Sequence, residues 1–187
     1  LPKEAPWLRN GGKNPYSKAR RVRECKLDAA MLHVLTSLNG ARVKARDTKR
    51  AADIKQLATA IRLYYDDNGS YPSNAGCKNG WCCLGHGDAG TCWHSTDIYN
   101  GRTALDNSLS PKYISKISDD PLNKVSYYGD SYMYRTGTDA SGVHFGLHWG
   151  VESSNPTSQT CAGGRFGVWP PGMGIGFDYW CELELMR

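Results

Sequence analysis

The chain has 187 residues and a formal net charge of +5, with 40% hydrophobic and 22% charged residues. This length suits one compact domain, and this balance is that of a globular chain, which excludes a disordered or a membrane-embedded one. No stretch approaches the roughly 20 consecutive apolar residues of a membrane-spanning helix. We therefore expect neither a membrane anchor nor a signal peptide in the chain as given.

Residues 1–26 are predicted to form an irregular basic extension, because prolines and glycines interrupt any helical period. The positive charge is concentrated there. Its basic residues are Lys3, Arg9, Lys13, Lys18, Arg20, Arg21, Arg23 and Lys26. A basic tail can contact nucleic acid or anionic lipid, but no recognition motif accompanies this one, so we expect no nucleic-acid partner.

Residues 27–67 are predicted to form a helix, because apolar residues recur there in steps of three and four. The residues assigned to its core and assembly face are Leu27, Met31, Val34, Leu38, Ile54, Leu57 and Ile61. Such a helix would be about 60 Å long at 1.5 Å per residue. We expect part of it to protrude or to meet another subunit. Asn68, Gly69 and Pro72 supply a strong stop signal.

Residues 68–124 are predicted to be a disulfide-pinned loop region with a short helical turn near residues 103–109. The candidate disulfide cysteines are Cys77, Cys82, Cys83, Cys92, Cys161 and Cys181. Their even number favours three disulfides and an oxidising compartment. We favour Cys161 with Cys181, and the other two bridges within residues 77–92; Cys25 is then left over.

Zinc is the alternative for the cysteine-rich loop, because thiolates together with His94 are suitable ligands. The spacing fits no common zinc module, so disulfides are preferred.

Residues 125–187 are predicted to form an antiparallel sheet of three to four strands. Residues 125–135 are rich in tyrosine, and residues 143–152 and 175–185 alternate between apolar and polar side chains. The alternation directs His144 and His148 outward into solvent. Residues 136–141 are predicted to be a turn and residues 153–174 a second long loop. The fold class is therefore α+β.

Two sequence blocks carry a resemblance to a known family. The first comprises SLNGARVKARDTKR at 37–50, DIKQL at 53–57 and YYDDNGSYP at 64–72; the second comprises PKYISKISDDPLN at 111–123 and YMYR at 132–135. In this order and spacing, they resemble the long helix, helix exit and sheet entry of bacterial type IV pilins and type II secretion major pseudopilins. The resemblance covers residues 35–152. It implies one long N-terminal helix packed on a small sheet, without catalytic or cofactor-binding residues.

Two features depart from the family pattern. Its members begin with a leader and a continuous apolar half-helix, whereas residues 1–33 are charged and interrupted. We therefore expect the chain beginning at Leu1 to be soluble and mostly monomeric at low salt. Residues 153–174 contain neither Asp nor Glu, so the calcium site of many major pseudopilins is not expected here either.

The resemblance implies a structural subunit of an extracellular bacterial filament, polymerised with copies of itself through the helix. No G-x-S-x-G, H-E-x-x-H or phosphate-binding glycine motif is present, so we expect no enzyme activity. The alternative is a minor pilin or surface adhesin that binds carbohydrate or another surface through Trp81, Trp93 and Trp169. Whether the filament is a pilus or a secretion pseudopilus stays open.

Overall fold

The computed structural model describes residues 15–72, 81–84, 102–122, 132–139, 142–168 and 179–185. Side chains are described from residue 31 onward, except at 81, 137–139 and 142–144. The chain groups into two compact units, residues 1–42 and 43–187. Helix α1 (Pro15–Asn68) has residues in both units.

Helix α1 begins at Pro15, whereas the sequence pattern predicted an irregular segment up to residue 26. Proline suits the first helical turn, because its φ is already helical and the missing N–H would have no intrahelical partner. No Pro or Gly follows until Gly40, and the Lys and Arg residues of this stretch are good helix formers. Propensity therefore extends the helix where no apolar period marks it.

The end of α1 confirms the predicted stop. Asn68 is the last helical residue, and Gly69 takes a φ of 68°, the left-handed conformation that glycine adopts without a steric penalty. The Gly69 N–H donates to the Tyr65 carbonyl at 2.8 Å. This bond satisfies one of the carbonyls that the end of a helix leaves open.

Five antiparallel strands form one sheet, which corrects the expected three to four. They are β1 (Trp81–Cys83), β2 (Met133–Asp139), β3 (Gly142–Val151), β4 (Arg165–Val168) and β5 (Tyr179–Glu184). Their spatial order is β1-β2-β3-β5-β4. Together with α1 and α2 (Arg102–Leu109), the sheet confirms the α+β class and the predicted short helical turn.

The sequence pattern located the longest strand and missed the shortest ones. β3 follows the predicted alternation, with Leu147, Trp149 and Val151 buried in the core. β1 and β4 fall in segments expected to be loops. β2 continues through the expected turn, because Thr136 to Asp139 pair with Phe145 to Gly142. The predicted strand stretches 125–131 and 175–178 lie outside the described residues.

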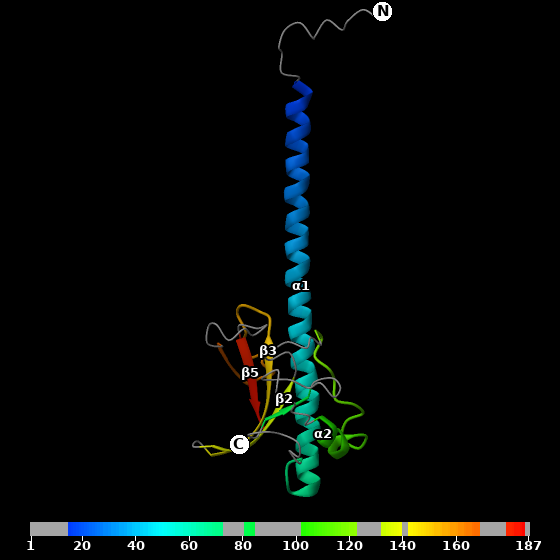
Figure 1. Ribbon diagram of the computed structural model, residues 1–187, viewed down its shortest axis with the longest axis vertical. Helices are drawn as coiled ribbons and strands as arrows, with labels where there is room; N and C mark the ends of the chain where they lie inside the picture. Colours follow the sequence, from blue (N-terminus) through cyan, green and yellow to red (C-terminus); the bar gives the residue numbers. More distant parts are fainter. Residues whose placement is uncertain are drawn as a thin grey trace, which may run out of the picture. The chain divides into compact units, whose positions relative to one another are not determined.

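In the unit of residues 43–187, the sheet lies along one side of α1 (Figure 1). The buried apolar residues that α1 contributes to the core are Ala51, Ile54, Leu57, Ala58, Ala60 and Ile61. These positions recur at three- and four-residue steps, so one stripe of the helix covers one face of the sheet. Leu105 and Leu109 of α2 close the same core.

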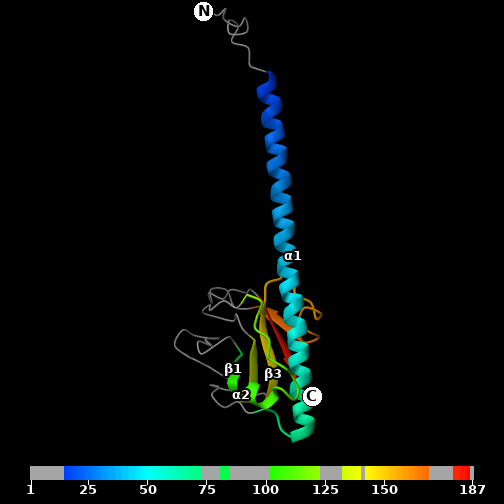
Figure 2. The ribbon, with the colours of Figure 1, turned by 90° about the vertical axis from the view of Figure 1, so that its right-hand side faces the viewer.

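Arg102 joins α2 to the segments on either side of it. Its guanidinium donates to the Leu84 carbonyl at 3.3 Å and to the Ile117 carbonyl at 2.6 Å, and it also pairs with Asp119. α2 and β1 accordingly lie at the same end of the sheet (Figure 2).

Replacing Leu57 with Asp is expected to lower the free energy of unfolding by several kcal/mol, because Leu57 is only 2% exposed and the change would bury a charge. The matched control is Thr59→Asp on the exposed side of the same helical turn, which should change stability by about 0.5 kcal/mol or less. Chemical denaturation of both variants measures the difference. Equal midpoints would contradict the packing of α1 on the sheet.

Candidate functional site

The residues predicted as one helix face divide into two groups. Ile54, Leu57 and Ile61 are at most 2% exposed and belong to the core of the folded unit. Met31, Val34 and Leu38 are between 49% and 59% exposed. Leu27 lies in α1, but its side chain is outside the described residues. The sequence pattern found the face and could not separate its two roles.

Four exposed apolar side chains, Met31, Val34, Leu35 and Leu38, form what we call the apolar stripe. Their spacing places them within an arc of about 100° on the helix, the width of the apolar face of an amphipathic helix. Leu32 lies beside them and is 63% exposed. Large apolar side chains gathered in this way are typical of an interaction surface.

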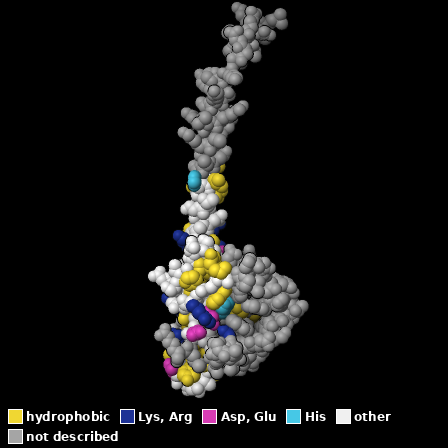
Figure 3. Space-filling model, turned by 90° about the vertical axis from the view of Figure 1, so that its left-hand side faces the viewer, with side chains coloured by type: hydrophobic (Ala, Val, Ile, Leu, Met, Phe, Trp, Pro, Cys, Tyr) yellow, Lys and Arg dark blue, Asp and Glu magenta, His cyan; other side chains and the backbone are white. Residues whose placement is uncertain are grey.

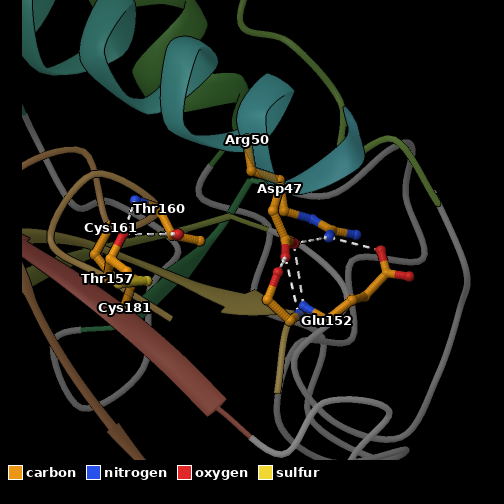
Figure 4. Close-up of a disulfide and its surroundings, with 8 residues drawn as sticks. Asp47, Arg50, Glu152, Thr157, Thr160, Cys161 and Cys181 are labelled. Carbon is orange, nitrogen blue, oxygen red and sulfur yellow. Dashed lines mark hydrogen bonds and ion pairs between the residues drawn. A yellow bond between two sulfur atoms is a disulfide. The ribbon is translucent and has the colours of Figure 1, made fainter. Parts of the chain in front are cut away.

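A second feature is a buried ion-pair cluster around Arg50, whose side chain is fully buried. Its Nε donates to Asp120 Oδ2 at 2.7 Å, and its Nη1 donates to Asp47 Oδ1 and Glu152 Oε1, each at 2.7 Å. Asp47 and Arg50 come from α1, Glu152 follows β3, and Asp120 lies between α2 and β2. The cluster therefore ties three segments together. Figure 4 shows the part of it that Asp47, Arg50 and Glu152 form.

Asp47 also fixes the chain where it leaves β3. Its carboxylate accepts the backbone N–H groups of Glu152 at 3.1 Å and Ser153 at 2.9 Å, and the Ser153 hydroxyl as well. Arg46 makes a two-point contact with Glu152 from the neighbouring position on α1. The carboxylates of Asp47, Asp120 and Glu152 are all engaged by arginine, so the cluster holds structure rather than offering an open site.

The charges of the cluster stabilise one another. Burial opposes ionisation of Glu152, but hydrogen bonds from Arg46 and Arg50 outweigh it and hold the pKa of Glu152 below its ordinary value. Burial likewise opposes the charge of Arg50, and its bonds to Asp120, Glu152 and Asp47 raise the pKa of Arg50. A carboxylate with a lowered pKa contributes stability above its unfolded pKa and loses it as the pH falls.

The sequence contains a signal for this cluster on the core-facing stripe of α1. Asp47 and Arg50 precede Ile54 by seven and four residues, which places both on the apolar face of α1. A charged pair on a core-facing stripe predicts burial with partners. The partners Asp120 and Glu152 are too distant in sequence for any local pattern to identify them.

The disulfide between Cys161 and Cys181 is present, as the sequence predicted, and both residues are fully buried. It joins the segment before β4 to β5 (Figure 4). Cys82 and Cys83 are also disulfide-bonded, so two of the thiolates required by the zinc alternative are engaged in other bonds. Cys77, Cys92 and His94 lie outside the described residues.

His148 is buried, and its predicted solvent exposure is wrong. It is 5% exposed and stacks on the Trp180 ring with the centroids 5.2 Å apart. Glu182, its cross-strand neighbour, is also 5% exposed and pairs with Arg135 and Arg165. The face of the sheet away from the core is therefore covered at this point, which alternation within one strand cannot reveal.

The structure does not describe the side chain of any of the three tryptophans predicted to bind a surface ligand. Trp81 lies in β1 without a described side chain, and Trp93 and Trp169 lie outside the described residues. The side chain of His144 in β3 is not described either. Over the described ranges, no three His, Cys, Asp or Glu side chains are grouped to hold a metal ion. No helix there has a sufficiently long apolar stretch to cross a membrane.

Comparison of the chain with protein-family models, curated proteins and solved structures finds no match.

Replacing Arg50 with Met is expected to destabilise the protein by about 3 to 5 kcal/mol, because it leaves buried carboxylates without their counter-ion. Lys49→Met is the matched control. Lys49 pairs with Asp53 at 2.6 Å on the same helix, but its side chain is 52% exposed, so the change should cost less than about 1 kcal/mol. Denaturant unfolding measures both values. Similar losses of stability for the two variants would contradict the stabilising role of the buried ion-pair cluster.

Stability is expected to fall between pH 7 and pH 5 because of His148. Burial, followed by the charges of Arg135 and Arg165, lowers the pKa of His148 to about 3. The unfolded chain, with a histidine pKa near 6.5, then binds a proton that the folded state does not, so acid favours unfolding. The loss relative to a His148→Phe variant should be about 2 kcal/mol at pH 5. Parallel stability profiles for the two proteins would contradict this assignment.

Proposed function

We propose that this chain is a non-enzymatic structural subunit of an extracellular filament of the pilin and pseudopilin kind. Copies of the chain polymerise through α1, and the sheet with its disulfide-pinned segments forms the outer body. The observation that carries the proposal is the apolar stripe. The same helix that buries Ile54, Leu57 and Ile61 in its own core leaves Met31, Val34, Leu35 and Leu38 about half exposed.

The energetics of the stripe favour many weak contacts over one strong pair. Complete burial of a large apolar side chain contributes about 1.5 to 3 kcal/mol, and these four are already half buried. Their association therefore yields about 3 to 6 kcal/mol in total. Association costs at least about 4 kcal/mol in lost translational and rotational freedom. A helix that contacts several neighbours at once is needed for a stable assembly, which is the arrangement of a filament.

Three further features support the proposal. The sequence blocks at residues 37–72 and 111–135 resemble pilin segments, and α1 with an antiparallel sheet is the architecture that the resemblance implies. The disulfide between Cys161 and Cys181 suits an exported protein, because thiols are kept reduced in the cytosol. The ion-pair cluster around Arg50 joins α1 firmly to the body of the subunit. A subunit that bears mechanical load requires such a joint.

The test compares the chain beginning at Leu1 with a version that carries an apolar half-helix ahead of Val34. We expect the first to sediment as a monomer at low salt, because its basic N-terminal residues repel one another across equivalent subunits. The second should form filaments visible by electron microscopy. Ordered filaments from the first would contradict the role given to its basic segment while supporting the filament function.

A variant of the filament-forming version tests the contribution of the apolar stripe to assembly. Changing Val34, Leu35 and Leu38 to Ser in the filament-forming version should abolish filaments without lowering the melting temperature of the folded unit. The control changes Leu63 and Tyr65 to Ser, because these are also exposed apolar side chains of α1, at 47% and 42%. Filaments that survive the first change, or that are lost equally in the control, would contradict assembly through the stripe.

A further inference from the structure

Asparagine followed by glycine is the residue pair most prone to deamidation, because glycine has no Cβ to hinder the reaction. The backbone nitrogen of the glycine loses its proton to solvent and attacks the asparagine Cγ. The Cγ–Nδ2 bond breaks, and the leaving nitrogen takes up a proton and departs as ammonia. Water then opens the resulting succinimide to aspartate or isoaspartate, so water is the only co-reactant. Among the described residues, this pair occurs at Asn39-Gly40 and Asn68-Gly69, and all four residues are exposed.

The structure gives the side chains of the two asparagines different contacts. Asn68 Nδ2 donates to the Tyr64 carbonyl at 2.7 Å and to the Tyr113 hydroxyl at 3.3 Å. An amide nitrogen carries two hydrogens, so both donors of Asn68 are engaged. Asn39 makes no side-chain hydrogen bond with another described residue. The group that reacts in deamidation is therefore held in place at Asn68 and not at Asn39.

The Tyr113 hydroxyl is itself held in position. It donates to Asp67 Oδ2 at 2.9 Å, and the Lys112 ammonium donates to the same oxygen at 2.7 Å. Because Tyr113 uses its single O–H on Asp67, its oxygen meets Asn68 as an acceptor. This hydroxyl therefore bonds to both of the side chains that directly precede Gly69.

The chain after Asn68 is fixed as well. The Gly69 N–H donates to the Tyr65 carbonyl at 2.8 Å, and two residues later the Tyr71 ring stacks on Phe145 with the centroids 4.1 Å apart. The attack on Cγ requires the Gly69 nitrogen to leave this carbonyl and the Asn68 amide to leave its two acceptors. Deamidation of the folded chain therefore passes through an opened end of α1, and losing any of these bonds makes that opening easier.

We propose that Asn68 is a deamidation site, that the Tyr113 hydroxyl sets its rate in the folded chain, and that the reaction loosens the end of α1. A carboxylate at position 68 cannot donate to the Tyr64 carbonyl. It also adds a negative charge beside Asp66 and Asp67, at the helix end where the dipole disfavours an anion. An acidic side chain already lies at the surface of this end of the molecule (Figure 3). The modification takes place in a single subunit and does not depend on the proposed filament function.

Peptide mapping by mass spectrometry follows the reaction in the full chain at mildly alkaline pH. Tyr113→Phe removes the hydroxyl and keeps the ring. Asn68 should then deamidate about threefold faster in the folded protein, the order of factor that one lost hydrogen bond gives. Tyr65→Phe is the matched control, because Tyr65 is also exposed at the end of α1 and its hydroxyl has no hydrogen bond to another described residue. The control should leave the rate at Asn68 unchanged.

Asn39 is an internal reference in every sample, and its rate should be the same in all three proteins. In denaturant, Asn68 should react equally fast with and without Tyr113→Phe, because the hydroxyl acts only through the fold. Equal rates at Asn68 in the folded forms of the unsubstituted chain and Tyr113→Phe would overturn the proposal. A rise at Asn39 as well as at Asn68 would also overturn it, because it would indicate a general loosening of α1.

Hydrogen exchange of the Gly69 amide measures the consequence of the modification. In Asn68→Asp this amide should exchange about threefold faster than in the unsubstituted chain, because the bond to Tyr64 is lost and the added charge favours opening. Asn39→Asp makes the same change of charge on α1 and should leave the Gly69 amide unchanged. Unchanged exchange in Asn68→Asp, or equal acceleration in both variants, would overturn the loosening of the helix end.

Discussion

The buried charge of Arg50 is the constraint around which the body of this protein is arranged. A guanidinium removed from water requires carboxylates within hydrogen-bonding distance, since an unpaired buried charge is too costly to keep. Asp47 lies on the same helix, but Asp120 and Glu152 are 70 and 102 positions away. The fold that satisfies Arg50 must therefore bring α1, the segment after α2 and the end of β3 to one point.

The ion-pair cluster and the apolar core contribute to the position of the same helix in different ways. Ile54, Leu57 and Ile61 supply non-directional burial, which holds α1 on the sheet without specifying its position along the strands. The hydrogen bonds of Arg50 and Asp47 are directional, and the Asp47 carboxylate accepts two successive backbone N–H groups after β3. Together they fix both the attachment and the register of the helix.

The exposed apolar surface of α1 is separate from the interactions that hold the body of the protein together. The apolar stripe is a surface that the fold leaves exposed, and it lies outside the ion-pair cluster and the core that stabilise the monomer. A subunit built in this way can vary its contacts with neighbours without changing its own stability. That separation suits a protein whose proposed function is assembly.

Local sequence patterns determined several elements by themselves. The end of α1 at Asn68, the short helix α2, the alternation of β3 and the Cys161–Cys181 bridge each depend on residues close in sequence or on cysteine number. The tertiary structure alone decided the rest. β1 and β4 are three and four residues long, which is too short for a period to appear. They form because a neighbouring strand pairs with them through backbone hydrogen bonds. His148 is buried because other strands and Trp180 surround it, and Arg50 is neutralised in part by Asp120 and Glu152, which only the fold brings near. Burial and long-range pairing depend on distances in space, which a sequence pattern does not contain.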